Sequence, residues 1–283
     1  MPVDAMQVWS ELADECSEAK HYYVGKDIGK DAILERGAAD FDQKCFPDDK
    51  HEGEHYRTDY YVSRDGYMNM HIEQNLVALR HCFKGGIPQP VLFVDFGCGP
   101  MTSGLALAEV LSGRVAGYKR QVAYFGVDAS RNMVNKAKII NKKHALFAPE
   151  LFAVKQRRQF NPQEIPDFFP KPRIAVLCLS FVLARNTLQT DIPQNESVRT
   201  SAVNWKEHVA RETQCRETRI IYLNPVGFGH ANWQRFFRPV FLNETPTGGL
   251  TYTENIKLKG IPVEYRAGYK RRIALGMIRG TRK

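Results

Sequence analysis

The chain has 283 residues, of which 43% are hydrophobic and 25% charged, and a formal net charge of +9. This length and composition allow a substantial buried core and exclude a fibrous or wholly disordered protein. No apolar run reaches the roughly 20 residues that cross a bilayer, and residues 1–20 are acidic rather than basic and apolar. We therefore expect a cytoplasmic protein that is not exported.

Charge is distributed unevenly along the chain. Residues 1–60 contain 15 acidic and 7 basic side chains, whereas residues 257–283 contain 9 basic and 1 acidic. A basic end can follow a nucleic acid or another polyanion, and an acidic end can face a basic partner. Two solvated surfaces without a partner explain the pattern equally well, so charge alone identifies no partner.

The six cysteines are scattered, and no two of them form a Cys-x-x-Cys pair. Such usage is typical of a reducing compartment and indicates neither a disulfide framework nor a zinc site. The segment HEGEH at 51–55 meets the His-Glu-x-x-His template, but Gly53 interrupts it and no apolar helical pattern surrounds it. We interpret it as a chance match in a polar loop and expect no metal.

The first 88 residues predict short helices. Apolar residues repeat at helical spacing at 8, 12 and 16, and again from Met68 to Leu79 on one face of a helix over about 70–83. Gly85 and Gly86 form a strong stop for the second helix.

From residue 91 onward, apolar strands alternate with helices. Strands are predicted at 91–96, 121–128, 150–156, 173–180 and 218–225. Helices are predicted at 103–112, 131–143 and about 198–214, the first of them capped by Thr102 or Ser103. Two further strands, within 249–260 and 269–280, are close in sequence and are expected to pair antiparallel.

This alternation predicts an α/β fold. We expect a doubly wound, Rossmann-like, mostly parallel seven-stranded sheet with an antiparallel C-terminal strand pair and a helical N-terminal extension.

The stretch VDFGCGPMTS at 94–103 joins the first predicted strand to the helix after it. In such sheets, ligands bind at the carboxyl ends of the strands. Because Gly97 and Gly99 lack a β-carbon, the main chain there can approach a ligand, and the N–H groups of the following helix face it. Taken alone, a Gly-x-Gly turn is weak evidence, since structural turns use the same residues.

Asp128 ends the second predicted strand in YFGVDAS. A carboxylate at this place in a nucleoside-binding sheet takes ribose hydroxyls. Asp128 follows Gly99 by 29 residues, more than the usual ~20, and we attribute the excess to a polar insertion at 112–121. The third glycine of a dinucleotide-binding turn is replaced by Thr102, which disfavours a dinucleotide.

Together, VDFGCGPMTSGLALAE and YFGVDASRNMVNKAK resemble the first two motifs of class I S-adenosylmethionine-dependent methyltransferases. The predicted element order from 91 to about 278, with its terminal antiparallel pair, matches that fold. We expect residues 1–88 to form a helical extension or lid. The resemblance, which covers roughly the last two thirds of the chain, implies an S-adenosylmethionine-binding methyltransferase domain at 89–283. It also implies methyl transfer to a nitrogen or oxygen of a small molecule or an RNA.

The resemblance further implies a set of cofactor contacts. Asp95, Gly97 and Gly99 would border the methionine part of S-adenosylmethionine, Asp128 the ribose and Ala129 the adenine. The full implied set is Asp95, Gly97, Cys98, Gly99, Thr102, Asp128, Ala129 and Ser180. For the adenine amino group, the segment after the third strand offers only Gln156 and Gln159.

For the acceptor side, the residues expected to line the site are Tyr60, Tyr61, Phe181 and Asn224. The tyrosines before residue 68 either fold over the cofactor as a lid or pack the N-terminal helices onto the sheet. LSFVLAR at 179–185 has no proline and so lacks the DPPY or NPPF signature of base-N methyltransferases. No catalytic base is identifiable.

Two other hypotheses stay open. One is a catalytically inactive, methyltransferase-like binding or scaffold protein. The other is a nicotinamide-dependent oxidoreductase, which the replaced third glycine and the lack of an evident Tyr-x-x-x-Lys motif disfavour.

Overall fold

The computed structural model describes residues 2–17, 62, 67–157, 160–167, 169–180, 192–211, 213, 215–225, 233–234, 238–242, 249–265 and 270–282. Within them, no helix combines the length and the apolarity that crossing a membrane requires.

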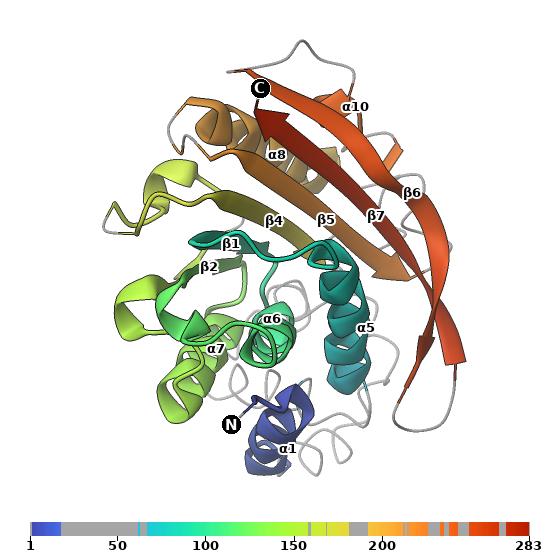
Figure 1. Ribbon diagram of the computed structural model, residues 1–283. Helices are drawn as coiled ribbons and strands as arrows, with labels where there is room; N and C mark the ends of the chain where they lie inside the picture. Colours follow the sequence, from blue (N-terminus) through green and yellow to red (C-terminus); the bar gives the residue numbers. More distant parts are fainter. Residues whose placement is uncertain are drawn as a thin grey trace.

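Seven strands form one sheet in the order β3-β2-β1-β4-β5-β7-β6 (Figure 1). Strands β1 to β5 run parallel, and β7 lies antiparallel between β5 and β6. The strands are β1 (Val91–Phe96), β2 (Val122–Asp128), β3 (Phe152–Gln156), β4 (Ile174–Ser180), β5 (Glu217–Pro225), β6 (Leu250–Glu264) and β7 (Lys270–Arg282). The predicted fold class is confirmed.

Helices cover both faces of this sheet (Figure 1). Helices α1, α5, α6 and α7 share one apolar cluster with the sheet, and α8 and α10 share the other. The described helices are α1 (Ala5–Glu15), α5 (Tyr67–Cys82), α6 (Thr102–Ser112), α7 (Arg131–His144), α8 (Ile192–Arg211) and α10 (Arg238–Leu242), with 3-10 turns η1 (Tyr118–Arg120), η2 (Pro149–Leu151) and η3 (Pro162–Glu164).

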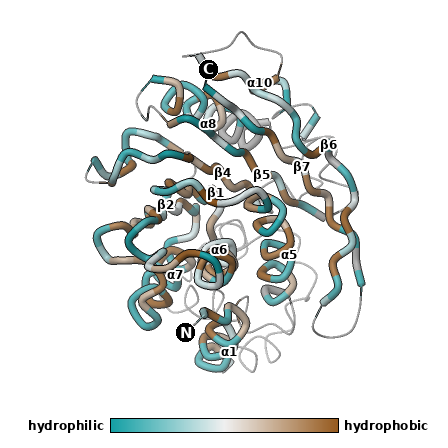
Figure 2. The backbone as a smooth tube through the Cα atoms, viewed as in Figure 1, coloured by the Kyte–Doolittle hydropathy of each residue, from teal (hydrophilic) through white to brown (hydrophobic). Residues whose placement is uncertain are grey.

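The central strands are apolar because helices cover them on both sides. All six residues of β1 and all seven of β4 are buried. Hydrophobic residues accordingly concentrate along the middle of the sheet and polar residues along the outer helices (Figure 2). Two apolar layers therefore enclose the sheet, and its strand ends are where polar groups gather.

The N-terminal helix α1 belongs to the same layer as α6. Asp4 caps it by accepting hydrogen bonds from the N–H groups of Met6 and Gln7 at 3.0 and 3.2 Å. The N–H groups of Val3 and Ala5 donate to Ser112 and Glu109 on α6. Whether residues 1–88 act as a lid stays a prediction, since residues 18–61 lie outside the described residues.

The start of α6 differs from the prediction. Its N-cap is Met101, in a left-handed conformation with φ of 72°, and the Met101 side chain makes no capping hydrogen bond. Thr102 is the first helical residue, and the Ser103 hydroxyl donates to Asp95 instead. The predicted cap was wrong because a buried carboxylate on the neighbouring strand attracts that hydroxyl.

The helix predicted at 198–214 is α8, which begins earlier, at Ile192, and ends at Arg211. Pro193 lies in its first turn, where a proline needs no N–H partner within the helix.

Candidate functional site

The glycine turn after β1 folds back over the end of β2. Gly97, Gly99 and Met101 have left-handed φ angles of 73°, 52° and 72°. The N–H groups of Gly97 and Cys98 donate to the Val127 carbonyl at 2.8 and 3.0 Å. Glycine is favoured at such angles because a β-carbon would be strained there. The turn is thus held against the carboxyl end of the neighbouring strand.

Asp128 is tied to this turn by its carboxylate. The Gly99 N–H donates to Oδ2 at 2.9 Å, and the Ser130 N–H donates to Oδ1 at 2.8 Å. Burial raises the pKa of Asp128, and the two N–H donors act in the opposite direction. The residue stays partly exposed. Since each carboxylate oxygen has two lone pairs, both can still accept a ligand hydroxyl.

The space above Gly99 is open. A β-carbon built on this glycine would meet no atom of the described residues within 4 Å. The main chain therefore lies bare at the junction of two strand ends, next to a carboxylate. This is the geometry that a close main-chain approach to a ligand requires.

Asp95, the last but one residue of β1, is fully buried. Its Oδ2 accepts hydrogen bonds from the Tyr124 hydroxyl at 2.6 Å and from the Ser103 hydroxyl. Its Oδ1 has no hydrogen-bond partner among the described residues. Burial raises the pKa of Asp95 to about 6, the two hydroxyl donors lower it, and the charge of Asp128 raises it.

Gly104 lets α6 approach β2 and so places Tyr124. A β-carbon on Gly104 would lie 2.4 Å from Met101 Cγ and 2.8 Å from the Tyr124 ring. No larger residue fits without displacing one of them. The glycines of this region therefore have two roles: Gly99 faces open space and Gly104 faces the core.

Ser180, the last residue of β4, lies on the same face of the sheet as Asp95. Asp95 pairs with Cys178, and side chains two residues apart on a strand share a face. The Ser180 hydroxyl accepts a hydrogen bond from Asn75 Nδ2 on α5 at 3.0 Å. The structure thus brings Asp95, Ser180 and Asn75 to one edge of the sheet.

The sequence analysis missed Asn75. The available signal was the run Glu73-Gln74-Asn75, three polar residues in a helix whose next residues, Leu76, Ala78 and Leu79, are apolar. All three polar residues are buried, which their composition alone does not predict.

The remaining predicted cofactor contacts lie around the turn. The Cys98 thiol is buried, and its sulfur would lie 3.1 Å from a β-carbon built on Gly126. Burial raises the pKa of this thiol. Only the main chain of Cys98 can therefore face a ligand. Thr102 is buried at the start of α6, and Ala129 is partly exposed, with its carbonyl accepting from Gln156 Nε2 at 3.3 Å.

The predicted acceptor-lining residues are only partly placed. Asn224 is fully buried near the end of β5, on the face that Tyr222 shares, opposite the face of Asp95 and Ser180. The structure does not bring it into their group. Tyr60, Tyr61 and Phe181 lie outside the described residues, as do Gln159 and the segment 51–55.

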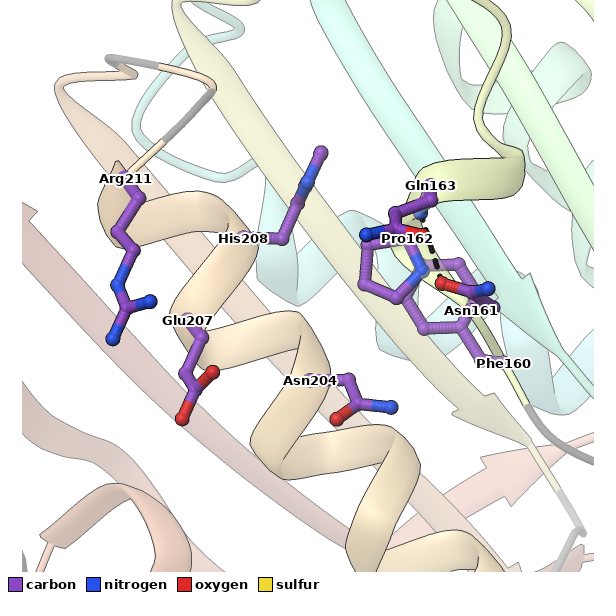
Figure 3. A pocket seen from close by; sticks show the side chains of 8 residues that line it. All are labelled: Phe160, Asn161, Pro162, Gln163, Asn204, Glu207, His208 and Arg211. Carbon is purple, nitrogen blue, oxygen red and sulfur yellow. Dashed lines mark hydrogen bonds between the residues drawn. The ribbon is translucent and has the colours of Figure 1, made fainter.

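A separate hollow of about 460 Å³ lies between η3 and α8, on the other face of the sheet (Figure 3). It is lined by Phe160, Asn161, Pro162, Gln163, Asn204, Glu207, His208 and Arg211. The Asn161 side chain accepts a hydrogen bond from the Gln163 N–H at 3.1 Å at its rim. None of the predicted site residues that the structure describes lines this hollow.

No protein-family model matches the chain, and no curated protein sequence matches it. Solved structures with low similarity are found. The YcgJ protein from Bacillus subtilis shares 14% identity over 73% of this chain and 98% of its own, with a TM-score of 0.42. A putative RNA methyltransferase from Pyrococcus horikoshii shares 14% identity over 74% and 82%, with a TM-score of 0.37.

The plantazolicin methyltransferase BpumL, solved in complex with SAH, shares 11% identity over 90% of this chain and 97% of its own, with a TM-score of 0.40. At such identities and TM-scores, the activities of these proteins say nothing about the activity of this chain. The mostly parallel sheet and its antiparallel C-terminal strand pair are those expected from the sequence, and the resemblance is confirmed at the level of fold alone.

Proposed function

We propose that this chain, which has the fold of class I S-adenosylmethionine-dependent methyltransferases, binds S-adenosylmethionine at the carboxyl edge of β1, β2 and β4 and transfers its methyl group. The observation that carries the proposal is the main chain of Gly99. Its N–H group donates a hydrogen bond to the Asp128 carboxylate, and the space where a side chain would stand is open among the described residues. A side chain over Gly99, or an Asp128 turned away, would contradict it.

The residues present fit such a cofactor. Asp128 offers carboxylate oxygens for two ribose hydroxyls, held in place by the N–H groups of Gly99 and Ser130. Asp95 Oδ1 is a buried acceptor without a donor among the described residues, as expected where a ligand supplies one. Ala129 lies next to Asp128 and is partly exposed, so it can border the adenine.

When bound, the cofactor supplies a methyl group already activated by a sulfonium. The protein then has to orient the two reactants, exclude water and, where the acceptor carries a proton, remove it. The buried strand ends and the turn that is hydrogen-bonded to the end of β2 serve the first two tasks. We propose a nitrogen or oxygen of a small molecule or an RNA as the acceptor, and we assign no catalytic base.

Calorimetric titration with S-adenosylhomocysteine tests the proposal. We expect the wild-type chain to bind it, and Asp128→Ala to weaken binding by about 100-fold, since hydrogen bonds to a charged group are lost. Asp167→Ala is the matched control, because Asp167 is exposed on the loop after η3.

The outcomes separate the hypotheses. Absence of binding by a folded wild-type chain would overturn the proposed function and favour a scaffold role. Equal binding by the two aspartate variants would show that Asp128 is not the ribose ligand. Circular dichroism of each variant shows whether a loss of binding reflects a loss of fold.

A further inference from the structure

Helix α5 places the buried side-chain amide of Asn75 at the carboxyl edge of the sheet. Asn75 is fully buried, and its Nδ2 donates to the Ser180 hydroxyl at 3.0 Å and to the His71 carbonyl at 2.9 Å. A backbone carbonyl can only accept a hydrogen bond. This contact therefore fixes the orientation of the amide and directs Oδ1 away from His71.

The oxygen of this amide is an acceptor without a donor. Asn75 Oδ1 has no hydrogen-bond partner among the described residues. A buried polar atom in this condition costs stability unless a ligand or water completes it. The residue is positioned by two contacts, so it cannot turn toward another donor without breaking them.

A second acceptor of the same kind lies on the same face. Asp95 Oδ1 is also buried and has no hydrogen-bond partner in the described part of the chain, while its Oδ2 accepts hydrogen bonds from Tyr124 and Ser103. Asp95 pairs with Cys178 on β4, and Ser180 follows two residues later on the same face. Ser180 and the Asn75 amide bonded to it therefore lie beyond Asp95, toward the carboxyl edge of the sheet. The glycine turn follows Asp95 directly.

These groups share one chemical preference. The two orphaned oxygens are acceptors only, one of them on a carboxylate, and the Ser180 oxygen retains acceptor capacity. A primary ammonium, with three N–H donors and a positive charge, satisfies such a set, whereas a carboxylate would be repelled by it.

We propose that Asn75, together with Asp95, binds the α-ammonium group of the methionine part of the cofactor. This inference rests on the proposed function and adds a cofactor ligand from α5, which precedes the first motif in sequence. The competing hypothesis is that the methyl acceptor, and not the cofactor, donates an N–H to Asn75 Oδ1.

The test compares two ligands that differ only at the amino-acid end. S-Adenosylhomocysteine carries the ammonium, and 5′-methylthioadenosine has the same nucleoside and thioether without the amino acid. We expect Asn75→Leu, which is similar in size, to weaken S-adenosylhomocysteine by about 10-fold or more and to change methylthioadenosine by less than about twofold.

Gln74→Met is the matched control variant. Gln74 is the neighbouring buried amide on α5, and its Oε1 also lacks a partner in the described structure. Its Nε2 donates to the hydroxyl of Tyr265, which follows the edge strand β6, three strands away from β4. We expect this change to leave the affinities of both ligands within about twofold of wild type.

Each outcome decides between the hypotheses. Equal weakening of both ligands by Asn75→Leu, or no weakening of either, overturns the inference; in the second case Asn75 is free to serve the acceptor. Binding of neither ligand by the wild-type chain is instead the failure of the proposed function. A wild-type titration with the deamino analogue of S-adenosylhomocysteine needs no variant: affinity within about twofold of the parent also overturns the inference.

Discussion

Two polar clusters lie at opposite edges of the same sheet, and they differ in how many of their polar atoms have hydrogen-bond partners. The amino-edge cluster consists of Glu217, Arg219 and Arg279. Glu217 accepts from Arg219 Nε at 2.5 Å and from Arg279 Nη2 at 2.8 Å, and the Arg219 guanidinium also donates to the Cys82 carbonyl. Every charge in this cluster has a protein partner.

The carboxyl-edge cluster consists of Asp95, Asn75 and Ser180, and it is incomplete. Two of its oxygens lack donors among the described residues, and burial raises the pKa of Asp95 to about 6. The amino-edge cluster, in which every charge is paired, connects α5 to β5. The carboxyl-edge cluster has unpaired acceptors that a ligand can use, and these unpaired atoms lower the stability of the fold. The comparison predicts that removing charge has opposite effects at the two edges.

Asp95→Asn should stabilise the fold and weaken ligand binding. The folded pKa of about 6 exceeds the ordinary 3.8, so ionisation of Asp95 subtracts stability as pH rises from about 4 to 6. At pH 8, the variant should gain up to about 3 kcal/mol in the free energy of unfolding. Urea unfolding at pH 8 and pH 4 measures this, and the difference between the two chains should shrink at the lower pH.

In the same variant, the affinity for S-adenosylhomocysteine should fall at least about 10-fold, because a charge-assisted contact is lost. A variant that is less stable at pH 8, yet binds normally, would show that the carboxyl edge is a structural cluster like the amino edge.

Glu217→Gln should have the opposite effect on stability. Removing the carboxylate leaves Arg219, whose side chain is only 12% exposed, without its charge partner. We expect a loss of about 2 kcal/mol, below the usual cost of breaking a buried pair because Arg279 is 44% exposed. Chemical denaturation gives the loss, and calorimetry should show unchanged affinity per folded molecule.

Gly104→Ala tests the packing that places Tyr124 next to Asp95. The added methyl group would meet Met101 and the Tyr124 ring at less than 3 Å. We expect a loss of about 1.5 kcal/mol from overpacking, seen as a lower melting temperature. Stability equal to wild type would mean that α6 can move away from β2 at no cost.

Gly99→Ala is the counterpart with the smallest effect on stability. No atom of the residues that the structure describes lies within 4 Å of the added carbon, and only the φ of 52° is strained, which should cost about 1 kcal/mol. Affinity for S-adenosylhomocysteine should fall more than for Gly104→Ala, because the methyl group enters the space above the turn. The reverse order of affinities would contradict the proposed approach of the ligand.

Much of the candidate site followed from local signals. Apolar runs predicted the strand boundaries, and glycines and strand-ending acids predicted the turn after β1 and the carboxylate at the end of β2. All of these signals depend only on residues that are close together in the chain. The helix cap was predicted wrongly and Asn75 was missed, because Ser103 and Asn75 are bonded to partners on other elements, Asp95 and Ser180.

By itself, the sequence determined the succession of strands and helices, their approximate ends and the position of the bare turn, because backbone preferences and hydrophobic periodicity are set within a few neighbouring residues. Only the tertiary structure decided the strand order, the face on which Asn224 lies and the meeting of Asn75 with Ser180 across 105 positions. Hydrophobic periodicity indicates that one face of an element is buried, but it does not indicate which other element packs against that face. The hydrogen-bond partners of a buried polar group depend on that neighbouring element.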